Sequence, residues 1–344
     1  MNLPQNVRVM QQANNYVSQA TVKELRVRPF FEDAIVFAKV GAAISHERKR
    51  IAHSPFLIDN NMMAFTPKQK EDLEFIYHLF QRIKLSKYSQ IGALPSYNAS
   101  DILDIRTFYP TSKSERNKIV TILNLVSNRI EKQAEMITNL KKYKRGLHKL
   151  VFIKNRKPSW EKSALHDIAS FCGGGTPSKD VSSYWDGEIG WISSSDIQEE
   201  WIDDISVTRR ITKKAIDNSA TKLCPEGTIA IVSRVGVGKV AIIPESLCTS
   251  QDFTNITSIT GNTHYMAYQI AFRMKLEAMK TQGTSIKGVT ADTIKSMVLD
   301  IPPLEEQKKI ADMLTAFDSY IKRAVYELNL FLTMKKALLQ QLFI

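Results

Sequence analysis

The chain repeats itself at a spacing of 191 residues. Residues 119–153 align without a gap on residues 310–344. Matching pairs in this register are Leu123 with Leu314, Ile130 with Ile321 and Lys144 with Lys335. Self-similarity at a long period indicates two copies of one structural unit. We therefore expect a protein that folds the same unit twice and presents the same kind of surface twice.

Each copy has strand-like segments followed by one long helical segment. Residues 33–41 and 227–236 are rich in β-branched side chains and end near glycines, which predicts a buried strand in each copy. In residues 111–154 and 303–344 the apolar positions recur at steps of mainly three and four. That spacing is typical of the apolar seam of a coiled coil. Because both seams belong to one chain, we expect them to pair with each other in antiparallel orientation.

These patterns predict an α+β fold, in which two mixed α/β domains are separated by two long helices that pair as an antiparallel coiled coil. The expected boundaries are 1–110 for the first domain, 111–154 for the first long helix, 155–302 for the second domain and 303–344 for the second long helix. A helix of about 35–40 residues is roughly 50–60 Å long at 1.5 Å per residue.

Composition narrows the class of partner. Of the 344 residues, 43% are hydrophobic and 24% charged, which is a globular composition. The formal net charge of +12 favours an anionic partner, nucleic acid before a membrane surface. The sequence contains no apolar run long enough to span a bilayer and no secretion signal at its start. Cys172, Cys224 and Cys248 lack the spacing of a disulfide or zinc framework, so we expect a cytoplasmic protein without a membrane partner.

Two like domains on an antiparallel pair of helices are related by an approximate two-fold axis. Double-stranded DNA offers matching faces to such an arrangement when two half-sites are separated by a gap. A duplicated, basic chain of this kind therefore predicts a protein that reads DNA at two separate half-sites.

Two segments carry a family resemblance. Residues 165–178 contain a Gly-Gly-Gly-Thr-Pro turn, followed by Tyr184-Trp185 and by the Trp-Ile strand in residues 189–196. Residues 300–310 read Asp-Ile-Pro-Pro-Leu-Glu-Glu-Gln-Lys-Lys-Ile and open the second long helix. Together they resemble specificity subunits of Type I restriction-modification systems, over roughly residues 20–344.

The resemblance implies a DNA-binding subunit with two target recognition domains, a bipartite asymmetric target and no catalysis of its own. It implies three partners: double-stranded DNA, two modification (adenine methyltransferase) subunits and restriction/translocase subunits. The cofactors S-adenosylmethionine, ATP and Mg²⁺ are then expected in the partner subunits, and none in this chain. The first domain is expected to lack the usual opening segment, because nothing like the Gly-rich turn occurs in residues 1–30.

The candidate DNA contacts of the second domain begin in the Gly-rich loop. Its members are Gly173, Gly174, Gly175, Thr176, Ser178 and Lys179. Free N–H groups, hydroxyls and a lysine suit phosphate oxygens, although a tight turn is the simpler interpretation. Tyr184 and Trp185 are expected either to contact a groove or to belong to the core. Ser193, Ser194 and Ser195 are expected either to read bases or to cap a helix.

Arg234 and Lys239 are predicted to present positive charge from the end of a strand. The Gly-Lys pair beside them does not form a nucleotide-binding loop, because the two glycines are too close and Val240 replaces the hydroxyl residue. Gln251 is expected either to pair with adenine or to cap a turn. By the resemblance, Ser285 and Lys287 lie in a loop near DNA, and Ser96 occupies the matching loop of the first copy.

In the first domain, Lys39 and the run Arg48, Lys49 and Arg50 are candidate backbone contacts, with a solvated face as the alternative. The sequence has no His-Glu-x-x-His, Cys-x-x-Cys or Gly-x-Ser-x-Gly motif and no adenine methyltransferase segment. A self-contained methyltransferase or nuclease is therefore disfavoured. The main alternative is a coiled-coil adaptor that binds proteins without sequence-specific DNA binding.

Overall fold

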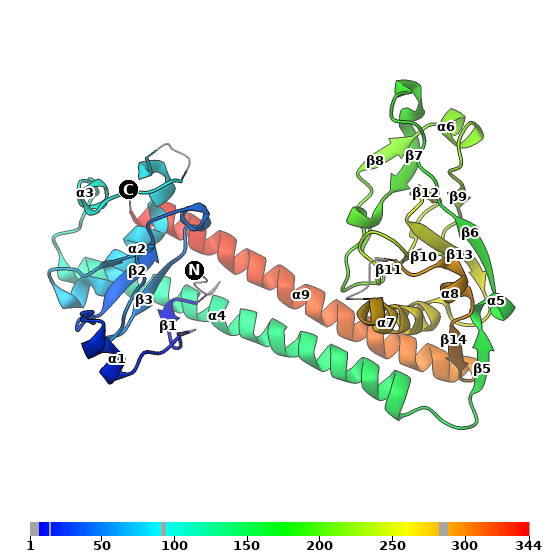
Figure 1. Cartoon of the computed structure of the whole chain (residues 1–344), viewed down its shortest axis with the longest axis horizontal. Coiled ribbons are helices and arrows are strands. Elements are labelled where there is room, and N and C mark those ends of the chain that lie inside the picture. The colour runs from blue at the N-terminus through cyan, green and yellow to red at the C-terminus, as the bar shows by residue number, and fades with distance from the viewer. Residues whose placement is uncertain (1–6, 14, 91–93, 282–287, 344) are drawn as a thin grey trace. The chain divides into compact units, whose positions relative to one another are not determined.

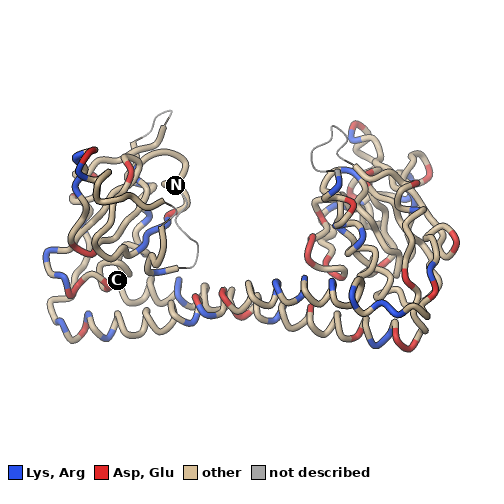
Figure 2. Tube along the Cα trace, turned by 60° about the horizontal axis from the view of Figure 1, so that its bottom comes forward, with Lys and Arg blue, Asp and Glu red and all other residues tan. Residues whose placement is uncertain are grey.

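The computed structural model describes residues 7–13, 15–90, 94–281 and 288–343. The chain folds into two compact units (Figure 1). Unit 1 comprises Met1–Leu140 and Lys322–Ile344, and unit 2 comprises Lys141–Ile321. Each long helix therefore contributes one end to each unit. Lys and Arg are spread over both units and along both long helices (Figure 2).

Unit 1 contains a four-stranded sheet in the order β1-β3-β2-β4, covered by helix α2. Its elements before the first long helix are β1 (Val9–Met10), α1 (Gln19–Glu24), β2 (Ala34–Ala38), the 3₁₀ turn η1 (Ala42–His46), β3 (Lys49–Ala52), β4 (Met62–Phe65), η2 (Lys70–Asp72), α2 (Leu73–Arg82), η3 (Leu85–Tyr88) and α3 (Ala99–Leu103). Helix α2 buries Phe75, Tyr77, His78, Leu79 and Phe80, and only a helix that is covered on most of its surface buries such a continuous run.

Unit 2 contains two four-stranded sheets, in the orders β11-β10-β13-β6 and β8-β7-β12-β9, and the pair β14-β5. Its elements between the long helices are β5 (Glu161–Ala164), α5 (Leu165–Ile168), β6 (Ala169–Gly173), η5 (Ser182–Tyr184), β7 (Trp185–Ile192), η6 (Ser194–Asp196), β8 (Arg209–Ile211), α6 (Lys213–Asp217), β9 (Leu223–Cys224), β10 (Ile229–Val232), β11 (Val240–Ile242), β12 (Leu247–Thr249), β13 (Phe253–Ile259), α7 (Thr263–Thr281), α8 (Ala291–Lys295) and β14 (Val298–Ile301).

The two units repeat one strand arrangement. In unit 1, β2 lies between β3 and β4 with antiparallel pairing on both sides, and in unit 2, β10 lies between β11 and β13 in the same way. On one side of the central strand, Arg50 of β3 and Ala241 of β11 occupy equivalent paired positions. On the other side, Ala64 of β4 and Asn255 of β13 do so. Both pairs are 191 positions apart, whereas their central partners Val36 and Ala230 are 194 apart, so the pairing repeats and the connection from β2 to β3 is three residues longer than that from β10 to β11. The predicted buried strands correspond to β2 and β10, every residue of which is buried.

The long helices are α4 (Lys113–Lys149), continued by the π-helical turn η4 (Leu150–Lys154), and α9 (Leu304–Leu342). In unit 1 the beginning of α4 packs on the end of α9, where Leu123 shares a buried cluster with Leu339 and Phe343. The Gln133 side-chain amide donates to the Ala324 carbonyl oxygen at 3.0 Å. Higher residue numbers on α4 thus contact lower residue numbers on α9, which confirms that the two helices pair in antiparallel orientation in this unit.

In unit 2 the end of α4 packs on the beginning of α9. Leu147 and Val151 belong to the same cluster as Ala311 and Leu314. The Lys144 ammonium forms an ion pair with Asp318 at 2.7 Å, although the Asp318 side chain is only 3% exposed. The pairing is antiparallel here as well. None of the helices in the described ranges has both the length and the apolar character needed to span a membrane.

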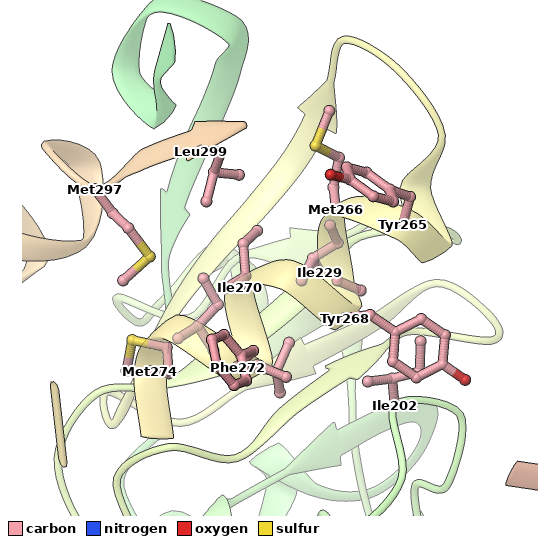
Figure 3. Close-up of a cluster of buried hydrophobic side chains, with 14 of the residues drawn as sticks. Ile202, Ile229, Tyr265, Met266, Tyr268, Ile270, Phe272, Met274, Met297 and Leu299 are labelled. Carbon is pink, nitrogen blue, oxygen red and sulfur yellow. The ribbon is translucent and has the colours of Figure 1, made fainter. Parts of the chain in front are cut away.

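The main core of unit 2 lies around helix α7 (Figure 3). Tyr265, Met266 and Ile270 on α7 are fully buried and pack with Ile229 of β10 and Leu299 of β14. Full burial of each such side chain stabilises the fold by about 1.5–3 kcal/mol. This core fixes the sheet whose loops carry most of the predicted DNA contacts.

Candidate nucleic-acid interface

The Gly-rich segment of unit 2 is a closely packed turn after β6. A Cβ atom on Gly174 would lie 2.0 Å from the Ser250 carbonyl oxygen, and one on Gly175 would lie 2.5 Å from the Ala220 carbonyl carbon. The Gly175 N–H donates to the Thr249 carbonyl oxygen at 2.8 Å. Only glycine fits at these two positions, in agreement with the tight-turn interpretation. Gly173 differs, because a Cβ there would meet nothing within 4 Å.

The turn places polar side chains at the surface. The Thr176 hydroxyl donates to the side-chain oxygen of Gln251, which joins two predicted residues from segments far apart in the sequence. Ser178 and Lys179 are exposed, and the Ser178 carbonyl oxygen accepts from the Trp185 indole at 3.0 Å. Lys179 is therefore available to a ligand in solution, while Gln251 is held beside the turn.

The aromatic residues form a small core beneath this turn. Trp185 and Trp191 meet edge to face with centroids 5.3 Å apart, and Tyr184 packs on the same cluster. Trp191 is buried and its indole donates to the Gly175 carbonyl oxygen at 2.9 Å. Tyr184 and Trp185 are half-buried and pack on this cluster, which agrees better with the prediction that they belong to the core than with groove contact.

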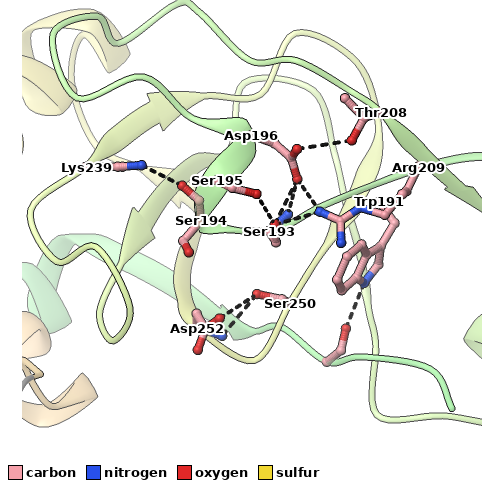
Figure 4. A network of polar contacts seen from close by, with 11 residues as sticks. Trp191, Ser193, Ser194, Ser195, Asp196, Thr208, Arg209, Lys239, Ser250 and Asp252 are labelled. Atoms are coloured by element: carbon pink, nitrogen blue, oxygen red, sulfur yellow. Dashed lines mark hydrogen bonds and ion pairs between the residues drawn. The ribbon is translucent and has the colours of Figure 1, made fainter. Parts of the chain in front are cut away.

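Ser193 and Asp196 cap the 3₁₀ turn η6 (Figure 4). The Ser193 N–H donates to the Asp196 carboxylate at 2.7 Å, and Arg209 donates to the same carboxylate at 2.5 Å. Burial raises the pKa of Asp196, but the Ser193 N–H and hydroxyl and the Arg209 guanidinium outweigh it and hold that pKa below its ordinary value. Ser193 thus acts as a cap, Ser194 is buried and Ser195 is exposed.

Arg234 and Lys239 lie at the two ends of the loop between β10 and β11. The loop is closed by the Val232 N–H, which donates to the Lys239 carbonyl oxygen at 2.9 Å. Arg234 is exposed, whereas Lys239 is half-buried and donates to the Ser194 carbonyl oxygen at 2.8 Å (Figure 4). The two cations therefore differ: Arg234 is presented to solvent and Lys239 ties this loop to η6.

These segments meet at one surface of unit 2. Strand β12 leads into Ser250, whose N–H donates to the Ile192 carbonyl oxygen at 2.9 Å, and the Gly-rich turn packs on the same stretch. We call residues 173–179, 193–195, 234–239 and 250–251 the loop cluster. Arg209 also belongs beside it, with its guanidinium 4.5 Å from the centre of the Trp191 ring. Arg209 was not among the residues predicted from the sequence, where the adjacent basic pair Arg209-Arg210 was the available signal.

The predicted residues of unit 1 are more deeply placed. Lys49 is 2% exposed, and its ammonium donates to Glu47 at 2.6 Å and to the Ile83 carbonyl oxygen at 2.8 Å. Burial lowers the pKa of Lys49. Arg50 is 6% exposed and donates to the Lys49 carbonyl oxygen at 2.6 Å. Lys49 is therefore held inside the unit and does not present its charge to solvent.

Lys39, Arg48 and Ser96 are half-buried. Ser96 pairs with Val40 and Gln90 through isolated bridges outside the named strands, next to Lys39. The remaining predicted residues, Ser285 and Lys287, lie outside the described residues. Within the described ranges, His, Cys, Asp and Glu form no group of three or more that could hold a metal ion.

Comparisons with known proteins agree with the duplicated fold. A model of the Type I restriction modification DNA specificity domain matches residues 7–141 and 158–329. The MjaIX specificity subunit of Methanocaldococcus jannaschii is 34% identical over 167 residues, which cover 47% of this chain and 39% of that protein. The EcoR124I/EcoR124II specificity subunit of Escherichia coli is 30% identical over 213 residues, which cover 59% and 52%. The chain thus spans about half the length of the curated relatives it matches.

Solved structures are similar in fold. The S subunit of the Type I restriction-modification system from M. genitalium has a TM-score of 0.60 at 13% identity, with 92% of this chain and 84% of that one covered. A chain from a structural study of assembly and conformational transition in the Type I system has a TM-score of 0.59 at 15% identity, with 91% and 82% covered. Because the family model covers most of the sequence in two consecutive stretches, the chain belongs to the Type I restriction-modification DNA specificity domain family.

Proposed function

We propose that this chain is the specificity subunit of a Type I restriction-modification complex, that it binds a bipartite DNA target and that it holds methyltransferase and restriction subunits in place. The observation that carries the proposal is the double match to the specificity domain, once in residues 7–141 and once in residues 158–329. Two copies of one DNA-binding domain call for two half-sites on the duplex.

The loop cluster supports DNA contact by unit 2. Lys179 and Arg234 are exposed, and both lie on loops that close contacts hold in place. Lysine and arginine on such loops neutralise phosphates, and arginine also reads guanine in the major groove. Ser195 and Gln251 are exposed polar groups beside them. We therefore assign phosphate contact to Lys179 and either phosphate or base contact to Arg234.

The long helices support the proposed role in assembly. Both helices carry large apolar side chains that are exposed in the described chain, and exposed apolar surface marks sites of protein contact. These side chains include Leu125 and Tyr143 on α4, at 71% and 68% exposed, and Tyr320 and Tyr326 on α9, at 53% and 63% exposed. We propose that methyltransferase subunits dock there. On this proposal S-adenosylmethionine, ATP and Mg²⁺ act in the partner subunits.

The proposal is tested first by duplex binding at several salt concentrations. If phosphate neutralisation dominates, log K falls with log [salt] with a slope of about −0.9 for each phosphate contacted. A coiled-coil adaptor would bind duplex DNA weakly and show no preference for any sequence. The same chain incubated with DNA and S-adenosylmethionine or Mg²⁺ should give no turnover, whereas methylation or cleavage by the chain alone would contradict the assigned role.

A further inference from the structure

Each unit contains a cavity between its domain and the long helices. The cavity in unit 1 has a volume of about 450 Å³ and the one in unit 2 about 500 Å³. The linings match in the register of the repeat, since Lys335, Ile130 and Arg48 in unit 1 occupy the places of Lys144, Ile321 and Lys239 in unit 2. The two cavities are therefore duplicated along with the fold.

In the cavity of unit 2, carboxylates of the same unit pair with lysines of the lining. Lys144 pairs with Asp318 at 2.7 Å and lies 4.6 Å from the centre of the Trp201 ring. Asp318 also accepts from the Tyr268 hydroxyl at 3.0 Å. A second lysine of the lining, Lys141, pairs with Glu200 at 2.6 Å. Two of the three cations that α4 contributes to this lining, Lys141 and Lys144, are thus paired with carboxylates within the unit, and the third is Arg145.

The cavity of unit 1 lacks that carboxylate. The position equivalent to Asp318 is Ser127, whose hydroxyl donates to the Leu123 carbonyl oxygen at 2.7 Å. Lys335, the equivalent of Lys144, makes no hydrogen bond and no ion pair with any described residue. Burial lowers the pKa of Lys335 to about 8, as expected for an ammonium with too little compensation.

The other charged groups of this lining are mostly cations. Arg8, Arg48, Arg50 and Lys336 line the cavity together with Lys335. The Arg8 Nε atom is buried and has no hydrogen-bond partner within the described chain. The Arg8 guanidinium is paired with Glu74, and the two carboxylates of the lining have hydrogen-bond partners other than Lys335, although the charge of Glu131 also acts on Lys335 and raises its pKa. Glu47 accepts from Lys49, and Glu131 accepts from the Arg8 N–H.

We infer that the cavity of unit 1 is a binding site for a phosphate group, which takes the place that Asp318 fills in unit 2. A phosphate carries negative charge on several acceptor oxygens, so it matches a lysine, several arginines and an unused N–H donor. The inference does not depend on the proposed function, because either a free phosphate ion or a phosphodiester of bound DNA supplies this chemistry.

The test places a carboxylate where unit 2 has one. In the full chain, Ser127→Asp gives Lys335 an internal partner, while Ser127→Asn has nearly the same size and no charge. Binding of inorganic phosphate is measured by equilibrium dialysis at low ionic strength. Duplex DNA binding is measured on the same proteins over a range of salt concentrations. Lys335→Met removes the cation and serves as the second variant if Ser127→Asp fails to fold.

We expect the wild type and Ser127→Asn to bind phosphate alike, and Ser127→Asp and Lys335→Met to bind it at least roughly tenfold more weakly. If the phosphate is free, DNA binding stays unchanged in all variants. If the phosphate belongs to DNA, Ser127→Asp instead lowers duplex affinity and makes the salt slope shallower by about 1 relative to Ser127→Asn. Equal phosphate binding and equal DNA binding in Ser127→Asp and Ser127→Asn would overturn the inference.

Discussion

At the residue scale, the Gly-rich turn separates glycines that have different roles. We predict that Gly174→Ala destabilises the protein by roughly 1–3 kcal/mol or more, since the new methyl group would overlap backbone atoms. A Cβ there would lie 2.0 Å from the Ser250 carbonyl oxygen, and both backbone segments are hydrogen-bonded, Gly175 N–H to the Thr249 carbonyl oxygen and Ser250 N–H to the Ile192 carbonyl oxygen. Chemical denaturation of the purified variant measures the effect.

Gly173→Ala is the matched control, because a Cβ at Gly173 meets nothing within 4 Å. Its free energy of unfolding should change by less than about 1 kcal/mol. Similar losses in the two variants would contradict the packing argument and indicate that both glycines are required for backbone conformation.

Arg234 is the exposed cation of the loop cluster and gives a second prediction at this scale. Arg234→Ala should weaken binding, or relax sequence preference, in only one half of the target. The loss is about 1–3 kcal/mol if the guanidinium reads a base. Competition binding with duplexes altered in one half-site at a time measures it. Lys308→Ala, which changes an exposed lysine on α9, should leave the preference unaltered.

At the element scale, the paired long helices are stabilised by apolar side chains at equivalent positions of the repeat. Leu123 on α4 is fully buried and Leu314 on α9 is 1% exposed. We predict that Leu123→Ala and Leu314→Ala each destabilise their own unit by about 2–5 kcal/mol. Hydrogen exchange or denaturation followed in each unit measures the loss.

Leu125→Ala provides the contrast on the same helix, since Leu125 is 71% exposed. Its effect on the free energy of unfolding should be within about 0.5 kcal/mol. A loss there as large as at Leu123 would mean that another surface covers this face of α4 in the isolated chain.

His148, near the end of α4, makes the stability of unit 2 depend on pH. It packs against the rings of Phe152 and Tyr268, and burial lowers its pKa to about 3. Between the unfolded pKa near 6.5 and the folded pKa near 3, only the unfolded state gains a proton. Stability from this group is therefore complete above about pH 6.5 and falls by up to about 1.4 kcal/mol per pH unit below it.

His148→Gln should remove that part of the slope when the free energy of unfolding is measured between pH 7 and pH 4.5. His264→Gln, which changes an exposed histidine, should leave the slope as in the wild type. The packing lost in His148→Gln lowers the free energy of unfolding equally at every pH. The difference in pH dependence of that free energy between the variant and the wild type therefore reports the protonation of His148 alone. An unchanged slope in His148→Gln would show that this histidine is also protonated in the folded state.

At the scale of the whole molecule, the duplication predicts a modular target. Exchange of residues 165–290 for the corresponding segment of another member of the family should change one half of the DNA motif and preserve the other. On the proposed function, each domain reads its half-site with its own loops, so an exchange within one domain leaves the loops of the other domain unchanged. Methylome sequencing of cells that carry the intact system reads both halves of the motif at once. A change in both halves, or in neither, would contradict one domain for each half-site.

Much of the architecture could be predicted from the sequence because it follows periodic patterns. The strands β2 and β10 were predicted from β-branched runs, and both long helices from apolar steps of three and four. These features depend on neighbours close in sequence, or on a repeat that is visible without coordinates.

The candidate site was predicted less well, because its residues depend on contacts between distant segments. Lys49 lies in a basic run, yet its ammonium is buried beside Glu47 and the Ile83 carbonyl oxygen. The sequence predicted equally that Ser193 reads bases or that it caps a helix. In the structure its N–H donates to Asp196 and its hydroxyl accepts from Arg209, and it acts as a cap. Residue type alone does not report which of these groups water reaches.

The sequence by itself determined the duplication, the long helices and the family. Each follows from the order of residues along the chain and from the spacing of apolar positions and motifs. Only the tertiary structure decided which cations face solvent and which are neutralised. Asp318 is far from Lys144 in sequence and 2.7 Å from it in space, whereas the equivalent Lys335 faces Ser127. Charge compensation acts through distance and burial, and folding sets both of them.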